Sequence, residues 1–472
     1  MTRFTRKVTT LFFSLLCWAA TAITPAVAAV DKNSEHARTT YRIYKTIVEM
    51  DSSKTSGGAP PVARYLASEF RQAGFADAAI EVIPVEHTSA LVVTYKGRAG
   101  SQHPPILFLG HMDVVEALAS DWQRAPFTLS EDNGYFFGRG TLDNKFGVAQ
   151  ISGAFIALRK AGYLPDRDLI IAFSGDEESG MVSTRYLASR EDLTKAAYAL
   201  NTDAGGGVLA DKGKAVVYRV QAAEKTYVSF QLEVKNPGGH SSRPRSDNAI
   251  YELAAALREI QAYRFPVMTT PMTLNYLKQA GKLSGGESGE TLLQFANDPT
   301  DREAADKLFN EPEYVGTTRT TCVATMLSGG HAENALPQSA TATVNCRVFP
   351  GSDVEGVKAS LQKAIDNQNV TITTITDYVE SPVSELREDV LNAITGSVYL
   401  RYPDVPIMPY LESGGTDGMH FRRAGVPTWG ISGLFLNPKD MFAHGLNERV
   451  PVAGFYDSLT HWPHIIKALA GE

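Results

Sequence analysis

The chain is organised around Ser174-Gly175-Asp176-Glu177-Glu178-Ser179-Gly180, which directly follows an apolar run at residues 169–173. A short apolar run bounded by turn residues is typical of a buried strand, so Glu177 and Glu178 stand where that strand ends. Adjacent carboxylates repel each other and need either free water or a nearby cation. A solvated acidic turn and a metal site are both open interpretations, and the rest of the chain has to distinguish them.

Strands and helices alternate on both sides of this segment. The hydrophobic pattern predicts helices at residues 37–50, 60–73, 146–158 and 182–188, and strands at residues 80–85, 90–95, 105–109, 169–173 and just before Asn201. This alternation indicates an α/β sheet covered by helices on both faces.

After about residue 221 the pattern changes. It predicts, in order, a strand at 227–234, a helix at 248–262, strands at 321–326 and 340–348, a helix at 354–365 and a strand at 370–375. The order β-α-β-β-α-β is typical of a small ferredoxin-like α+β domain. From about residue 381 the first pattern returns, with helices at 390–399, from 417 and from 452, and strands at 405–411 and 426–431.

The sequence therefore predicts one α/β domain interrupted by a second domain. The α/β domain comprises residues 29–222 and 381–472, and the inserted α+β domain comprises residues 223–380. A polar, helix-prone segment at 264–318 lies inside the insertion, and the pattern assigns it to no core element.

Composition and charge exclude several classes of protein. With 472 residues, 43% hydrophobic and 21% charged, the chain has the composition of a globular protein of more than one domain. The formal net charge of −7 argues against nucleic acid and anionic membranes as partners.

The first 28 residues have the pattern of a secretory signal peptide. Arg3, Arg6 and Lys7 precede an apolar run at 11–23, and the segment ends in Ala26-Val27-Ala28. This run is shorter than the roughly 20 residues of a membrane span. We expect cleavage near Ala28 and a secreted or periplasmic protein with no membrane contact afterwards; a retained anchor is the alternative.

Cys322 and Cys346 lie in the two predicted strands of one hairpin. If that hairpin is centred on Asn334, the two cysteines face each other. In an oxidising compartment a disulfide between them would stabilise the fold by roughly 3 kcal/mol. Two buried free thiols are the alternative.

Residues that commonly bind metals follow successive predicted strands. They are His111, Asp113, Asp143, Asp176, Glu177, Glu178 and Asp203, with His444 in a loop near the C-terminus. Each alone could be a capping or turn residue, but ligands bind at the strand ends of α/β sheets. Two imidazoles and three carboxylates suit two divalent ions bridged by one carboxylate. Mixed nitrogen and oxygen ligands favour Zn²⁺, with Co²⁺ or Mn²⁺ as substitutes.

Three motifs, in their order and spacing, resemble those of a family of di-zinc hydrolases. They are Gly110-His111-Met112-Asp113, the segment 122–127 leading to Gly138-Arg139-Gly140-Thr141-Leu142-Asp143, and Asp176-Glu177-Glu178. The family includes carboxypeptidase G, acetylornithine deacetylase, succinyl-diaminopimelate desuccinylase, aminoacylase and several dipeptidases. The resemblance extends from about residue 37 to the C-terminus.

The resemblance implies a role for each of these residues. His111 and Asp203 would bind one zinc ion, Glu178 and His444 the other, and Asp143 would bridge both. Asp113 would orient His111, and a cis peptide would follow Asp143. Glu177 would act as the general base, taking a proton from a water that bridges the zinc ions and passing it to the leaving amine.

A further motif, Pro237-Gly238-Gly239-His240-Ser241-Ser242, resembles the family segment whose histidine reaches the active site from the inserted domain. In dimeric relatives that histidine comes from the partner subunit, and here His240 would help to stabilise the oxyanion. We therefore expect a homodimer formed through the inserted domain. An ordinary turn residue is the alternative for His240.

Segments that resemble the substrate-carboxylate site contain Asn334, Arg347, Gly415, Thr416 and Asp417. Arg347 can offer two parallel donors to a carboxylate, although a surface charge is the alternative. Relatives often carry an arginine two positions after the aspartate of the Gly-Thr-Asp motif, where this chain has Met419.

These residues together predict the hydrolysis of an amide bond. Family peptidases usually carry aspartate at the position of Asp203, whereas the N-acyl amino acid deacylases usually carry glutamate. We therefore expect a carboxypeptidase or dipeptidase whose substrate, a small peptide, has a free carboxylate. An N-acyl amino acid amidohydrolase is the first alternative. A catalytically silent scaffold is the second, and the intact Glu177 and ligand set argue against it.

Overall fold

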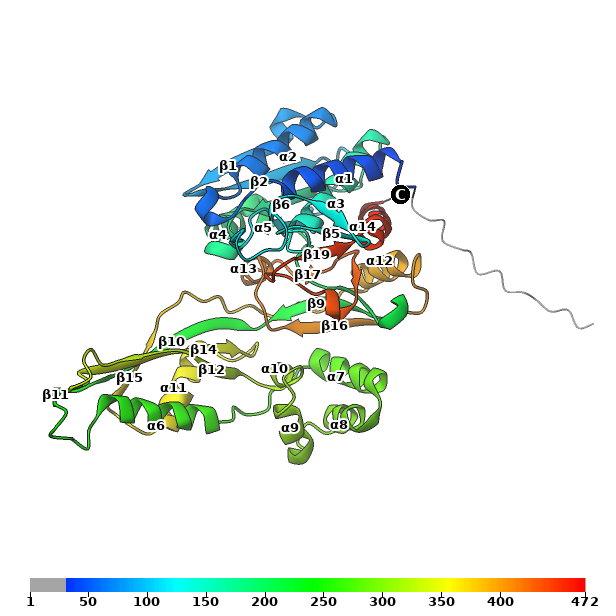
Figure 1. The fold of residues 1–472 in the computed structure, drawn as a ribbon. Helices are drawn as coiled ribbons and strands as arrows, with labels where there is room; N and C mark the ends of the chain where they lie inside the picture. Colours follow the sequence, from blue (N-terminus) through cyan, green and yellow to red (C-terminus); the bar gives the residue numbers. More distant parts are fainter. Residues whose placement is uncertain (1–30, 472) are drawn as a thin grey trace, which may run out of the picture.

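The computed structural model describes residues 31–471, in which a large α/β lobe lies above a smaller sheet domain and a group of helices (Figure 1). The predicted signal peptide, residues 1–28, lies outside the described residues. In the described part of the chain, every helix is too short or too polar to cross a membrane.

A ten-stranded mixed sheet forms the centre of the large lobe, in the order β1-β2-β6-β3-β7-β17-β9-β8-β18, with β16 also paired to β9. The strands are β1 (Ile80–Val85), β2 (Thr88–Tyr95), β3 (Ile106–His111), β6 (Leu169–Ser174), β7 (Tyr198–Asn201), β8 (Gly206–Leu209), β9 (Ala215–Glu224), β16 (Ile407–Glu412), β17 (Thr428–Gly430) and β18 (Phe435–Leu436). Because β3 runs parallel to both β6 and β7, the carboxyl ends of these three strands lie at one edge.

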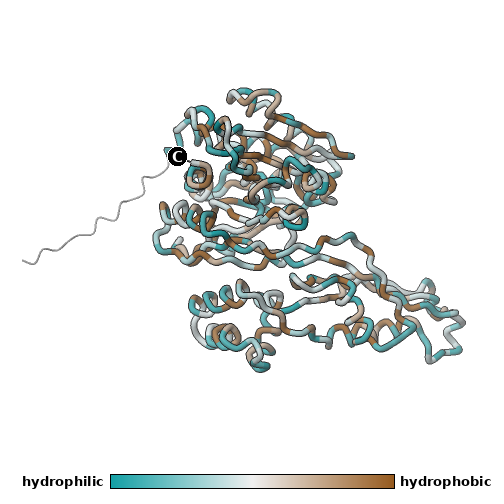
Figure 2. Tube along the Cα trace, turned by 180° about the vertical axis from the view of Figure 1, so that it is seen from behind, coloured by the Kyte–Doolittle hydropathy of each residue, from teal (hydrophilic) through white to brown (hydrophobic). Residues whose placement is uncertain are grey.

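Helices cover both faces of this sheet, which is why its central strands are apolar throughout. Phe108 and Ile171 face α1 (Glu35–Val48), α2 (Pro60–Gln72), α3 (Lys145–Lys160), α12 (Glu388–Tyr399), α14 (Val452–Asp457) and α15 (His461–Ala470). Leu107 and Ile170 face α4 (Val182–Ser189), α5 (Glu191–Thr194) and α13 (Gly418–Arg423). Figure 2, from behind, shows hydrophobic residues along the strands inside this lobe. The predicted α/β sheet is confirmed.

The inserted domain contains a four-stranded antiparallel sheet in the order β12-β14-β10-β15. Its elements are β10 (Thr226–Lys235), α6 (Ala249–Ala262), β12 (Thr321–Gly329), β14 (Ser339–Val348), α11 (Val354–Ile365) and β15 (Val370–Thr374). Both helices begin at capping residues, Asn248 and Asp353, whose side chains accept backbone N–H groups. Apolar residues of α6 and α11 pack on the sheet, as predicted for a ferredoxin-like α+β domain.

The segment at 264–318 forms four helices that lie beside this sheet and below β9 and β16 (Figure 1). They are α7 (Pro271–Ser284), α8 (Gly286–Asn297), α9 (Arg302–Phe309) and α10 (Val315–Thr318). Tyr276, Leu277 and Phe295 form one apolar cluster with Val217 of β9 and Met408 of β16. In packing, these helices therefore belong with the α/β sheet.

The two cysteines face each other across β12 and β14, in the register of a hairpin centred on Asn334. Cys322 and Cys346 are joined by a disulfide. The bond ties β12, an edge strand, to the interior of the inserted sheet, because β14 lies between β12 and β10.

We expect the denatured, unreduced protein lacking residues 1–28 to contain no free thiol and to show two thiols per chain after reduction. Reduction should lower the free energy of unfolding of the inserted domain by about 3 kcal/mol, since the bond closes a loop between cysteines 24 positions apart. Thiol titration and denaturant unfolding measure the two effects. A Cys322→Ser/Cys346→Ser double variant should be insensitive to reductant. Two free thiols before reduction would contradict the disulfide.

Candidate active site

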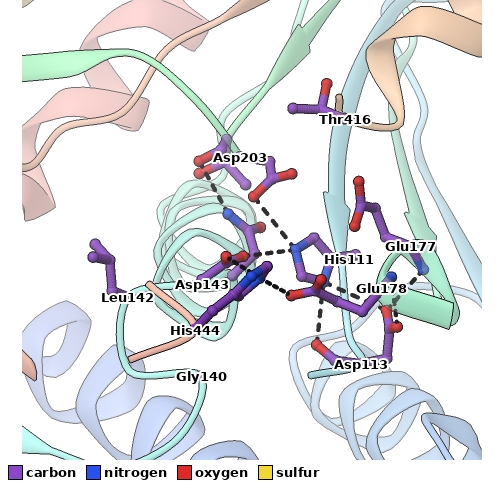
Figure 3. Close-up of polar contacts among 12 residues, drawn as sticks. His111, Asp113, Gly140, Leu142, Asp143, Glu177, Glu178, Asp203, Thr416 and His444 are labelled. Carbon is purple, nitrogen blue, oxygen red and sulfur yellow. Dashed lines mark hydrogen bonds and ion pairs between the residues drawn. The ribbon is translucent and has the colours of Figure 1, made fainter. Parts of the chain in front are cut away.

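Segments that are far apart in the sequence meet at the carboxyl ends of β3, β6 and β7 (Figure 3). Because the three strands are parallel neighbours, the residues that follow them share one edge of the sheet. The loop before α3 and the loop between β18 and β19 (Arg449–Pro451) reach the same point. The residues that gather there are His111, Asp143, Glu177, Glu178, Asp203 and His444.

Two groups of ligand atoms share the carboxylate of Asp143, and a third group joins Glu177 to His111 and Glu178. In the first, His111 Nε2 lies 2.9 Å from Asp143 Oδ1 and 3.3 Å from Asp203 Oδ1. In the second, His444 Nε2 lies 3.1 Å from Asp143 Oδ2 and 2.7 Å from Glu178 Oε1. Within each group the three atoms lie within 4.8 Å of one another. The two oxygens of one carboxylate thus face two separate imidazole–carboxylate pairs.

These donors fit a pair of divalent cations. Each group offers one imidazole nitrogen and carboxylate oxygens, and Asp143 can bridge the groups. Zinc accepts such a mixture, whereas calcium and magnesium favour oxygen alone. Two cations would also offset the negative charge that the three carboxylates concentrate in a largely buried place.

Burial and hydrogen bonds within the cluster shift the pKa values of its side chains. Burial, reinforced by the nearby charge of Asp143, raises the pKa of Asp203 to about 8. Burial also raises the pKa of Glu177 well above its usual value. Hydrogen bonds to Asp143 and Glu178 raise the pKa of His444 to about 10. In each case a raised pKa means that the side chain binds a proton more tightly. Divalent cations can supply the same positive charge.

Asp113 holds the acidic turn and the imidazole of His111 together. Its buried carboxylate accepts hydrogen bonds from the backbone N–H of Glu177 at 3.1 Å and of Glu178 at 3.0 Å. Its backbone carbonyl lies 3.1 Å from His111 Nδ1, and its Oδ1 lies 3.4 Å from the same nitrogen. Because Nδ1 donates on this side, Nε2 is free to face Asp143 and Asp203.

Two other aspartates near the turn have structural positions. Asp176 accepts from the backbone N–H of Val182 at 2.6 Å and of Ser183 at 2.9 Å, and so caps the start of α4. Asp417 accepts from Ser174 Oγ at 2.6 Å and also from Thr184 Oγ1. Asp417 is absent from the residues that line the cavity. Its carboxylate is bonded to the end of β6 and the start of α4, and the substrate contact implied by the sequence stays a prediction.

Glu448, which sequence reasoning missed, holds the loop that carries Asp143. Its fully buried carboxylate accepts from the backbone N–H of Gly140 at 3.0 Å, Leu142 at 2.7 Å and Asp143 at 2.9 Å. Arg139 Nη1 donates to it at 2.7 Å. The one feature of the sequence that pointed to a role for Glu448 was its position four residues after His444. The Asp143–Asn144 peptide that follows this loop is cis, as the resemblance implied.

A small sheet brings the two ligand loops side by side. It has the order β19-β5-β4, with β4 at Ser130–Asp132 and β5 at Tyr135–Phe137. β5 precedes Asp143 in the chain, and β19 follows His444. Glu448 therefore connects the two loops directly beside that sheet.

A cavity of about 540 Å³ opens onto the cluster. Arg347, Gly415 and Thr416 line it, so the structure brings these predicted substrate-binding residues to the metal-ligand groups. Arg347 Nη1 donates to the carbonyl of Ser413 at 2.9 Å, and its guanidinium lies 4.7 Å from the centre of the Tyr227 ring.

His240 and Asn334 lie elsewhere. β11 (Gly239–His240) pairs with β13 (Ala335–Leu336), and Ser241 N–H donates to the Asn334 carbonyl at 3.1 Å. This pair of strands forms the far tip of the inserted domain (Figure 1), and neither residue lines the cavity. One chain by itself does not bring these two residues to the cluster.

Known proteins share this sequence pattern and fold. Residues 107–468 match the family model described as Peptidase family M20/M25/M40. "Probable carboxypeptidase S-like 2" of Dictyostelium discoideum is 27% identical over 389 residues, which cover 80% of this chain and 74% of that protein. "N-fatty-acyl-amino acid synthase/hydrolase PM20D1" of Homo sapiens is 27% identical over 360 residues, 74% of this chain and 71% of that protein.

A solved structure shows the same fold. The M20 family metallo-carboxypeptidase Sso-CP2 from Sulfolobus solfataricus superposes with a TM-score of 0.65, at 18% identity, over 92% of this chain and 99% of the other.

Replacing Glu448 with glutamine would turn an NH₂ group toward the backbone N–H donors of the Asp143 loop. We expect the Glu448→Gln variant to bind metal about 10–100-fold more weakly, because a residue that positions a ligand is lost. Calorimetric titration of the metal-free protein measures the affinity. Glu131→Gln, an exposed change on β4, is the matched control. Equal affinity in both variants would show that Glu448 does not support the ligands.

Proposed function

This chain belongs to peptidase family M20/M25/M40, and on that premise we propose that it is a di-zinc hydrolase of amide bonds whose substrate carries a free carboxylate. One observation carries this proposal: two ligand groups share Asp143 at a cavity that also contains Glu177 and Arg347. That arrangement combines places for two cations, a base and a carboxylate-binding group.

His111 and Asp203 would hold one zinc ion, Glu178 and His444 the other, and Asp143 both. When bound, the two ions would supply Lewis acidity toward the acyl oxygen and the attacking water. Glu177 has the position of the general base. Its carboxylate lines the cavity, and one of its oxygens lies within 4.8 Å of the ligand atoms of His111 and Glu178. It would take a proton from the attacking water and deliver it to the amine nitrogen as the C–N bond breaks.

A peptidase of the carboxypeptidase or dipeptidase type is the form of this reaction that we favour. Asp203 is the residue usual in family peptidases, and Arg347 can bind the free carboxylate through two donors. The name of the Dictyostelium discoideum relative, a probable carboxypeptidase, supports the same substrate class.

A second candidate, the hydrolysis of N-acyl amino acids, is favoured by the apolar part of the cavity lining. The residues of this part are Leu142, Phe146, Val208, Leu434, Leu436 and Met441. Such a wall could take an acyl chain, since burial of apolar surface stabilises the complex. The human relative is named as a synthase and hydrolase of N-fatty-acyl amino acids.

We also propose that two copies associate through the inserted domain. β12 is an edge strand, and it exposes Val323, Met326 and Leu327 at 61%, 69% and 70% of their surfaces. Unpaired edges with exposed apolar side chains favour pairing with another chain. A partner's His240 could then reach the cluster, which the chain's own hairpin does not. The secreted or periplasmic location remains a proposal from the signal-peptide pattern alone.

The two adjacent glutamates should respond differently to substitution. Glu177→Gln should lower kcat on dipeptides and N-acyl amino acids by about 10²–10⁴-fold while metal content stays unchanged, because only the base is lost. Glu178→Ala should lose activity together with one metal ion. Elemental analysis and amine release measure both. Chelation should abolish activity, and Zn²⁺ should restore it.

The comparison of Ala-Leu with N-acetyl- and N-decanoyl-leucine separates the two substrate classes. Faster release of leucine from the dipeptide supports the peptidase, whereas faster release from the N-acyl substrates supports the second candidate. If the protein bound less than one metal ion per chain and the Glu177→Gln variant kept full activity, the proposal of a di-zinc hydrolase would be wrong.

A mixing experiment tests the shared site. Glu177→Gln and His240→Ala should each be nearly inactive alone, but a heterodimer contains one complete site. Refolding the two variants together should restore about a quarter of wild-type activity, as expected for random pairing in a two-fold dimer. Light scattering checks the dimer. Full activity of His240→Ala would contradict this arrangement.

A further inference from the structure

The active-site cavity contains a second guanidinium group, that of Arg219. Arg219 lies on β9, where it pairs with Gly206 of β8 and Met408 of β16, and it lines the same cavity as Arg347. Its Nε is buried and has no hydrogen-bond partner among residues 31–471.

Two of the buried arginines have a carboxylate partner, whereas buried Arg319 donates to the backbone carbonyls of Phe265 and Ala305. Arg139 contacts Glu448 at 2.7 Å, and Arg422 contacts Glu224 at 3.0 Å. Within the described residues Arg219 has no comparable carboxylate partner. A partly buried cation without a counter-ion is costly, and a planar guanidinium is well suited to bind a carboxylate. An anionic group of a ligand is therefore the natural partner of Arg219.

Two tyrosines of segment 264–318, Tyr276 and Tyr314, lie near Arg219. Burial raises the pKa values of Tyr276 and Tyr314, while the charge of Arg219 acts in the opposite direction on both phenols. Tyr276 comes from α7, and its ring lies 6.5 Å from that of Tyr410 on β16, which also lines the cavity. Arg219 thus lies near tyrosines from two parts of the chain, and a carboxylate bound there would gain a charge-assisted hydrogen bond.

The two arginines lie along β16, with Arg219 beside Met408 near its start and Arg347 beside Ser413 just past its end. Arg347 donates to the carbonyl of Ser413, and the only carboxylate of β16, that of Glu412, has partners of its own. Glu412 Oε1 accepts from Ser413 N–H at 2.8 Å and from Gly414 N–H at 3.2 Å, and Oε2 accepts from Tyr410 at 2.9 Å. This side of the cavity therefore combines two guanidinium groups with one carboxylate that is already hydrogen-bonded.

We infer that Arg219 binds a second carboxylate of the substrate, in addition to the one at Arg347, so that the enzyme prefers to release an acidic amino acid. This inference rests on the proposed function. Arg347 takes the α-carboxylate, and Arg219 takes the side-chain carboxylate of aspartate or glutamate. Tyr276 and Tyr314 of segment 264–318 then lie beside the group that sets this preference.

The test compares matched substrates that differ only in that carboxylate. For wild-type enzyme, kcat/KM should be about 10–100 times higher for Ala-Glu than for Ala-Gln, and likewise for N-acetyl-Glu than for N-acetyl-Gln. This factor is the range expected for one charge-assisted hydrogen bond. Arg219→Met should bring the ratio close to one by raising KM for the glutamate substrates alone. Arg219→Lys should keep part of the preference. Arg64→Met is the matched control, because it removes the same charge at an exposed position on α2. This variant should keep the full preference for the glutamate substrates.

A binding measurement separates this inference from the proposed function. Calorimetry should show that L-glutamate binds the metal-loaded protein more tightly than L-glutamine does, and that Arg219→Met loses the difference. If no substrate is hydrolysed but glutamate binding still depends on Arg219, the proposed function fails and the anion site stands. If amides are hydrolysed without a Glu/Gln preference, or Arg219→Met and Arg219→Lys both keep that preference, the inference is wrong and the hydrolase stands.

Discussion

The architecture depends on holding three carboxylates and two imidazoles within a few ångströms of one another. Two like charges 4 Å apart repel by about 4 kcal/mol at the effective dielectric of a protein surface, a large fraction of the ~5–15 kcal/mol that stabilises a domain. Two kinds of contact within the chain offset this repulsion. His111 and His444 lie between the carboxylates, and Asp113 and Glu448 fix the ligand loops through backbone N–H groups. Two cations would supply the remaining compensation.

Much of the fold follows from local sequence pattern, because central strands covered on both faces are uniformly apolar. The strand at 80–85 and the helix at 354–365 occur where the pattern predicts them, and the buried strand that ends at Ser174 does so within one residue. The site could be anticipated for a related reason. Parallel strands end at one edge of a sheet, so metal-binding residue types that recur after successive strands come together in space.

The rest depended on contacts that no local pattern shows. The sequence pattern did not predict β9, because the strand contains the buried polar residues Gln221 and Glu224. These two side chains form hydrogen bonds or ion pairs with each other and with Arg422. Without β9, the helices of segment 264–318 had no visible partner. Glu448 acts on backbone groups about 300 positions earlier in the chain, and Asp417 bonds to a serine 243 positions away.

The anchoring of both ligand loops by one carboxylate has a consequence for the binding equilibria. Asp143 belongs to both ligand groups, and Glu448 joins the loop of Asp143 to the segment that follows His444. A first cation that orders this shared loop leaves less conformational entropy to be lost when the second one binds. Two cations held there would be thermodynamically linked: the effect of the first on the affinity for the second would equal that of the second on the first.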